Sequence, residues 1–307
     1  MEQLTSELKF TTIDTKVPIY NLNYYKDNYT LMYEKGYTEH IGAATTRYNP
    51  AFLFYKNDGI IGASLHYYGE YTENEIHLLN NLIQPGFIVY DIGANIGYHT
   101  VGLAQTSKHV YAFEPNLKNY KLLKLNTVHN KNVTAFNLAI GREICITEIS
   151  DFDLNTMGNY GECMITEEGQ TCEMTTIDHL VKTKQIEPPN VVKIDVEGHE
   201  WNVVQGMTNT IKDNLPIIFY EHMHGDDLPK VHELLEQLGY EIFWFPVGNY
   251  NPNNYYKNAT NVFGQGGVLN VVACPFYLNA KTNLPKKLHK DETWAEAVER
   301  LKNATQN

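Results

Sequence analysis

Cysteine is scarce in this sequence of 307 residues, and no two of the four cysteines form a C-x-x-C pair. This spacing argues against a zinc ribbon and against a thioredoxin-type redox pair. Cys163 and Cys172 could meet across a hairpin, but reduced thiols agree better with a cytosolic protein, because disulfides are rare in the cytosol. We therefore predict neither a disulfide scaffold nor a cysteine-based metal site.

Long hydrophobic runs are also missing, and no stretch approaches the ~20 apolar residues that are needed to cross a bilayer. The first twelve residues, MEQLTSELKFTT, combine neither a basic segment nor an apolar core, so they predict no secretion signal. We expect a cytoplasmic protein that does not attach to a membrane.

Basic residues are outnumbered: 24 Lys and Arg face 36 Asp and Glu, which gives a formal net charge of -12 at pH 7. Such a charge repels a long phosphate polymer and lowers the odds of a DNA or RNA partner. Hydrophobic residues make up 43% and charged residues 20%, as in ordinary globular proteins with a buried core. We expect no nucleic-acid partner, and the composition leaves the oligomeric state open.

Residues 1–70 show no clear helical periodicity and are rich in Tyr, Asn and Thr. Within them, Asn57-Asp58-Gly59 separates the β-prone runs FLFYK and IIGASL, and an Asp-Gly turn between such runs predicts a β-hairpin. We interpret residues 1–70 as an N-terminal cap of strands and loops.

From residue 71 onward, short apolar runs alternate with helical patterns. The first helix is predicted from Thr72 to Ile83, where apolar residues recur at helical spacing before Pro85-Gly86. Seven runs are suited to buried strands: FIVYDIG, HVYAFEP, VTAFNLAIG, VVKIDVEG, PIIFYEH, YEIFWF and VLNVVACP. This alternation predicts an α/β fold with a Rossmann-like, doubly wound and mostly parallel sheet of seven strands.

Two segments depart from the alternation. Residues 142–177 predict a β-hairpin inserted after the third strand, and the Asn- and Tyr-rich loop 247–267 is too long to be a simple connector. We expect one domain from 71 to 280 and a C-terminal helical tail from 281 to 307, with its helix at Asp291–Asn303.

The most informative motif is the segment DIGANIG at 91–97, which follows a predicted strand and precedes a helix. Open α/β sheets bind ligands beyond the carboxyl ends of their strands, where glycines permit sharp turns and close approach. The spacing Gly93-x-x-x-Gly97 differs from the G-x-G-x-x-G dinucleotide fingerprint. Asp91 would repel a pyrophosphate but could accept hydrogen bonds from the ammonium of S-adenosylmethionine. A turn that only packs a strand against a helix is the alternative.

A second acid, Glu114, ends the next predicted strand and is followed by Pro115. A carboxylate at this place can accept hydrogen bonds from both ribose hydroxyls of an adenosine cofactor. Asn137, after the third strand, falls where the adenine edge would lie, although Asn is common in turns.

From Gly69 to Pro275 the chain resembles the FkbM-type methyltransferases, through DIGANIGYHT, AFEP, NLAIG, TTID, KIDVEGHE and IIFYE in this order. Gly69-x-Tyr71 before the first helix is also similar, but Thr72 departs from the family, which often has Glu after this Tyr. The resemblance implies a class I methyltransferase fold and S-adenosylmethionine-dependent O-methylation of a hydroxyl, often on a sugar or glycan. It implies that the cofactor contacts residues of these motifs: Tyr71, Asp91, Gly93, Ala94, Asn95, Gly97, His99, Thr100, Glu114, Pro115, Asn137, Ala139 and Asp195.

Candidate catalytic residues follow the fourth and fifth strands. Asp195 and Glu197 are two apart and would point to the same side of an extended strand. A sugar hydroxyl needs a general base or a metal to remove or polarise its proton, and Glu197, His199 and His222 are candidate bases. Glu221 and His222 could serve as base, or could join Asp195 around a divalent metal such as magnesium. A solvated acidic turn that caps the following helix is the alternative.

Two other functions use the same kind of sheet. An NAD-dependent oxidoreductase disagrees with the glycine spacing, and a non-catalytic module that binds the cofactor or a glycan would be expected to have lost some of the acids. The acceptor of the methyl group is not fixed by fold or cofactor, so its assignment as a sugar depends on the resemblance.

Overall fold

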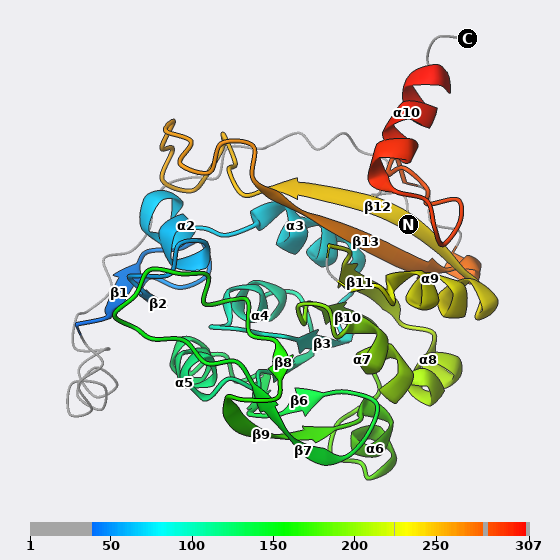
Figure 1. Ribbon diagram of the computed structural model, residues 1–307, viewed down its shortest axis with the longest axis horizontal. Coiled ribbons are helices and arrows are strands. Elements are labelled where there is room, and N and C mark those ends of the chain that lie inside the picture. Colours follow the sequence, from blue (N-terminus) through cyan, green and yellow to red (C-terminus); the bar gives the residue numbers. More distant parts are fainter. Residues whose placement is uncertain (1–38, 224, 279–281, 305–307) are drawn as a thin grey trace.

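The computed structural model describes residues 39–223, 225–278 and 282–304, and is built around one seven-stranded sheet (Figure 1). The strand order is β12-β13-β11-β10-β3-β4-β5, and β13 alone in this sheet runs antiparallel to its neighbours. The predicted Rossmann-like fold is thereby confirmed. The strands are β3 (Ile88–Ile92), β4 (His109–Phe113), β5 (Val133–Phe136), β10 (Val191–Ile194), β11 (Ile217–Glu221), β12 (Tyr240–Gly248) and β13 (Gly267–Pro275).

Helices cover both faces of this sheet. Ile88, Tyr90 and Ile92 of β3 pack in one core with α6 (Ile177–Lys182), α7 (Glu200–Gly206), α8 (Thr208–Asn214) and α9 (Leu228–Gln237). Val89, between them, packs on the opposite face with α3 (Glu73–Leu82) and α4 (Tyr98–Leu103). Side chains alternate along a strand, so a run that is apolar at every position is buried on both faces. None of the helices among the described residues has the length and apolar character that a bilayer span requires.

The interruption at 142–177 forms a second, smaller sheet. Strands β7 (Cys145–Ile149) and β9 (Gln170–Thr175) pair antiparallel, as predicted, and β8 (Ile165–Thr166) extends the edge. The third predicted strand divides at Asn137, and its second part, β6 (Ala139–Ile140), pairs with β9 instead of continuing the main sheet. The inserted sheet is thereby attached at the carboxyl end of β5.

The predicted hairpin around Asn57-Asp58-Gly59 is wrong. Strand β2 (Phe52–Tyr55) pairs with β1 (Ile41–Ala44), and the second run becomes helix α2 (Ile61–Tyr68). The Asp58 carboxylate accepts a hydrogen bond from the Ile60 amide, and the Asp58 carbonyl accepts one from the Ala63 amide. These bonds start a helix whose buried Ile61, Leu65 and Tyr68 recur at helical spacing. Residues 1–38 of the predicted cap lie outside the described residues.

The described part of the cap shares a core with the main domain. Phe52 and Phe54 of β2 and Leu65 of α2 are buried with Tyr98 and Val101 of α4. Helix α5 (Leu117–Asn126) also contacts β2. At the other end, α10 (Trp294–Ala304) places Trp294 6.1 Å from Trp244 of β12, between ring centroids.

Asn126 is a buried polar link between this cap and the main domain. Its side chain donates to the carbonyls of Leu53 and Ile96 and accepts from the Leu53 amide, and it is almost fully buried. Replacing it by Ala leaves these backbone groups unpaired, so we expect Asn126→Ala to lower the free energy of unfolding by about 2–3 kcal/mol. Urea denaturation would measure this loss, with the exposed Asn155→Ala as control. A loss below about 0.5 kcal/mol would contradict the role given to Asn126.

Candidate active site

A cavity of about 320 Å³ opens at the carboxyl edge of the parallel strands, and its volume is typical of small-molecule sites. The ends of β3, β4, β10 and β11 meet there, as expected for ligand sites of open α/β sheets. Predicted residues that line the cavity are Tyr71, Gly93, Ala94, Asn95, His99, Glu114, Pro115, Ala139, Asp195, Glu197, His199 and Glu221.

The glycine turn after β3 forms the floor of this cavity. A Cβ on Gly93 would lie 1.7 Å from the Asp195 carbonyl oxygen, and the φ of Gly93 is +81°, a conformation that favours glycine. The amides of Gly93 and Ala94 both donate to the Phe113 carbonyl. Gly93 therefore allows the ends of β3 and β10 to approach closely.

Glu114 lies on the cavity wall at the end of β4. Its carboxylate accepts hydrogen bonds from the Asn95 and Asn116 amides, both at 2.8 Å, and it is 4% exposed. Burial raises the pKa of Glu114 to about 7, with Asp91 and Asp195 adding to the shift and the two amide bonds opposing it. Each carboxylate oxygen keeps a further lone pair with which it can accept a bond from a ligand.

Asp91 differs from its predicted place. It is fully buried and is not among the lining residues; its Oδ2 accepts a 2.6 Å hydrogen bond from Thr100 Oγ1. Its Oδ1 lies 3.5 Å from Lys193 Nζ, which is also 3.1 Å from Asp195 Oδ2. The two acids raise the pKa of Lys193 against the lowering effect of burial. Asp91 therefore does not line the cavity itself. It contacts Lys193, which does.

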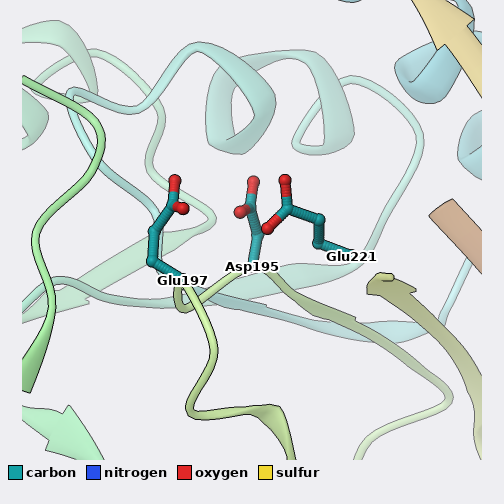
Figure 2. A group of neighbouring side chains, drawn as sticks. All are labelled: Asp195, Glu197 and Glu221. Carbon is teal, nitrogen blue, oxygen red and sulfur yellow. The ribbon is translucent and has the colours of Figure 1, made fainter. Parts of the chain in front are cut away.

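Three carboxylates form the most acidic part of the cavity. Figure 2 shows Asp195, Glu197 and Glu221 with their carboxylates at the same level, and oxygen atoms of the three lie within 4.8 Å of one another. The sequence brings Asp195 and Glu197 together, and the parallel pairing of β10 with β11 adds Glu221. We call these three residues the acidic cluster.

The environment of the acidic cluster disfavours negative charge. Burial raises the pKa of Glu197 to about 8 and that of Glu221 to about 9, and Asp195 contributes to both shifts. Carboxylates with raised pKa values are typical of groups that transfer protons near neutral pH.

The two candidate histidines differ in position. His199 lines the cavity, and its Nδ1 is 3.2 Å from the Asn202 side-chain nitrogen. With that amide donating, the neutral ring has its proton on Nε2 and no free acceptor. His222 is not a lining residue; its ring is 5.0 Å from that of Trp244, between centroids. This geometry favours the acidic cluster over either histidine as the group that takes a proton.

Asn137 and Gly97 also lie outside the cavity wall. Asn137 donates to the carbonyls of Glu114 and Pro115, and so holds the end of β4. Gly97, with φ +90°, packs against Leu123 of α5. Together with Thr100, these residues support the lining instead of forming it.

Several lining residues were not singled out from the sequence. Glu75 of α3 pairs with His99, with 3.1 Å between Oε2 and Nε2, and accepts a bond from Asn270 of β13. Thr72, which does not line the cavity, has its Oγ1 3.1 Å from the same His99 nitrogen. Only tertiary structure brings these segments together, although a polar Asn inside an apolar strand such as β13 is a sequence signal that could have identified Asn270.

The fold, with a cavity at the carboxyl edge of its parallel strands, is that of an α/β domain which binds a small molecule, and comparison with known proteins identifies the family. Residues 91–242 match the methyltransferase FkbM domain. The hexuronic acid methyltransferase AglP of Haloferax volcanii is 32% identical over 166 residues, which cover 54% of this chain and 68% of that protein. The chain belongs to the FkbM methyltransferase family, which confirms the resemblance and supports S-adenosylmethionine as methyl donor.

Solved structures give more distant matches. A methyltransferase FkbM from Methylobacillus flagellatus is 16% identical, with a TM-score of 0.41 over 61% of this chain and 43% of that one. Trm5b from Pyrococcus abyssi is 15% identical, with a TM-score of 0.42 over 76% of this chain and 56% of that one. This chain thus spans less than two thirds of either structure.

The ion pair between Asp91 and Lys193 is expected to contribute to the stability of the fold. Lys193→Met leaves the Asp91 carboxylate buried without its cation, so we expect a loss of about 3–5 kcal/mol in the free energy of unfolding. Adding Asp91→Asn to this variant removes the uncompensated charge and should recover part of the loss. Urea denaturation of both variants would measure the difference. A double variant no more stable than Lys193→Met would contradict the pairing.

Proposed function

We propose that the protein is an S-adenosylmethionine-dependent O-methyltransferase that acts on a hydroxyl of a sugar or glycan. The observation that carries this proposal is one cavity lined at the same time by Glu114, which suits a ribose, and by the acidic cluster, which suits a hydroxyl. The name of the Haloferax relative, a hexuronic acid methyltransferase, supports a sugar acceptor.

The residues present fit the methyl donor. Glu114 would accept hydrogen bonds from the ribose hydroxyls, and Gly93 leaves the floor open because it has no side chain. Leu138, Ala139 and Ile140 provide an apolar wall beside Glu114 that suits a planar base. When bound, S-adenosylmethionine supplies an electrophilic methyl carbon on a positively charged sulfur.

The acidic cluster would act on the acceptor. A hydroxyl is a poor nucleophile, and one carboxylate of the cluster takes the proton that the acceptor oxygen loses as it is methylated. Glu197 is our choice for this role, because it lies within 4.8 Å of the other two acids and is less buried than Glu221. An amine acceptor is less well suited, since three carboxylates would hold it in its protonated, non-nucleophilic form. The same carboxylates are those around which a divalent metal such as magnesium would bind.

Methyl transfer can be tested directly with ¹³C-methyl-labelled S-adenosylmethionine and a panel of neutral sugars, amino sugars and hexuronic acids, free and nucleotide-linked. We expect NMR to detect the label on a sugar oxygen, and calorimetry to show binding of S-adenosylmethionine but not of NAD. Glu114→Gln should weaken donor binding about tenfold or more, because it removes charge-assisted hydrogen bonds.

Other outcomes would separate the alternatives. Label on nitrogen would contradict O-methylation, and donor binding without transfer to any sugar would favour a binding module or a different acceptor. Asp91→Ala is a poor control, because it removes a partner of the buried Lys193 and so perturbs folding as well as binding.

Donor affinity should also depend on pH. The pKa of Glu114 is raised to about 7, so its carboxylate is mostly charged at pH 8 and mostly protonated at pH 6. The charged form accepts the ribose bonds, and we therefore expect affinity for S-adenosylmethionine to fall by up to about tenfold from pH 8 to pH 6. Asp91, Asp195 and the thiols of Cys163 and Cys172 are the titratable groups that interact with Glu114.

Calorimetric titrations at both pH values would measure this change. Glu114→Gln removes this titrating charge, so it should bind weakly and show a smaller change in affinity between the two pH values than the wild type. A wild-type affinity independent of pH would rule out the role given to Glu114.

A further inference from the structure

The acidic cluster has the spacing of a cation site. Its three carboxylate oxygens, one each from Asp195, Glu197 and Glu221, all lie within 4.8 Å of one another. Oxygen ligands on opposite sides of a magnesium ion are about 4.2 Å apart, and around calcium about 5 Å. Small side-chain movements would therefore let all three oxygens contact one ion.

Glu221 gives an independent sign that something is bound there. The residue is 7% exposed, it points toward Asp195 (Figure 2), and its Oε2 is buried with no hydrogen-bond partner. A buried carboxylate oxygen without a partner costs free energy unless a cation or a donor satisfies it. Because Glu221 lines the cavity, a partner for this oxygen would have to come from the cavity.

Among the residues that the structure describes, the cations near the cluster do not supply this partner. Lys193 is the lysine beside it, and its ammonium lies 3.1 Å from Asp195 and 3.5 Å from Asp91 on the side of β3. His99, another lining residue, pairs with Glu75. One ammonium shared by two acids leaves the cavity with an excess of carboxylates, since Glu114 and Glu162 line it as well.

The same cavity also contains a neutral oxygen without a partner. Asn249 lines the same cavity, and its Oδ1 is buried without a hydrogen-bond partner. Amide oxygens and carboxylates together are the ligands that magnesium, manganese and calcium accept in proteins, with water completing the shell.

We propose that Asp195, Glu197 and Glu221 bind one divalent cation with a preference for oxygen ligands, of which magnesium is the representative. Its role rests on the proposed function: the ion would bind the acceptor oxygen and lower the pKa of that hydroxyl. Each carboxylate that gives one oxygen to the ion keeps another oxygen, which can accept a hydrogen bond from the acceptor hydroxyl. Binding of the ion itself does not depend on the methyl donor.

The test is a titration of the chelator-treated, full-length protein with Mn²⁺, followed by electron paramagnetic resonance, with Mg²⁺ as competitor. We expect one Mn²⁺ per chain, displaced by Mg²⁺. Glu221→Gln keeps the shape of the side chain but removes its charge, and it should weaken Mn²⁺ binding at least tenfold. Glu167→Gln, at an exposed position of the inserted sheet, is the matched control and should bind as the wild type does.

Donor binding to the same samples distinguishes this inference from the proposed function. Wild-type protein that binds S-adenosylmethionine but takes up no Mn²⁺ at millimolar concentration would overturn the cation site and leave the methyltransferase proposal standing. Equal Mn²⁺ affinity of Glu221→Gln and wild type would also overturn it. Mn²⁺ binding in protein that fails to bind the donor would support the cation site and count against the function.

Discussion

The arrangement of the site depends on the ion pairs that the Lys193 ammonium makes with two carboxylates. It is 1% exposed, and it lies between Asp91 at the end of β3 and Asp195 just beyond β10. Asp91 is fully buried and the Asp195 side chain is 35% exposed, and without a cation between them the two carboxylates would repel each other. Lys193 therefore stabilises the pairing of β3 with β10 at the point where Gly93 closely approaches Asp195.

A second buried carboxylate holds the loop between β12 and β13, which contributes to the cavity wall. Glu70, 2% exposed, accepts hydrogen bonds from the Tyr255 amide and the Asn251 side chain. Tyr250 and Phe263 of the same loop pack their rings on Tyr68. The loop thus uses these aromatic residues for its own attachment, and the residue it directs into the cavity is Asn249. An acceptor would meet an amide at this wall instead of a row of aromatic rings.

The sequence allowed the fold to be predicted well because its strands are apolar at nearly every position and end in glycines and acids. Strands with such sequences are stable only when both of their faces are covered, and they therefore predict a sheet between two layers of helices. The prediction for residues 60–65 was wrong because it depended on a short sequence pattern alone. An Asp-Gly pair is typical of a hairpin turn, but the Asp58 side chain can equally start a helix. Pairing of β2 with β1, which decides between the two, is not visible in a short window.

The site was predicted at the level of strand ends but not of single side chains, and the alternation of strands explains the difference. Glu221 and His222 are neighbours, yet one lines the cavity and the other contacts Trp244, because consecutive side chains of an extended chain point to opposite sides. Lys193 was missed for the same reason: within VVKIDVEG it resembles an interruption of an apolar run. Its place two residues before Asp195 puts both on one side, and only the parallel neighbour β3 adds Asp91 to the pair. Charges that cancel across strands can therefore be recognised only when the strand order is known.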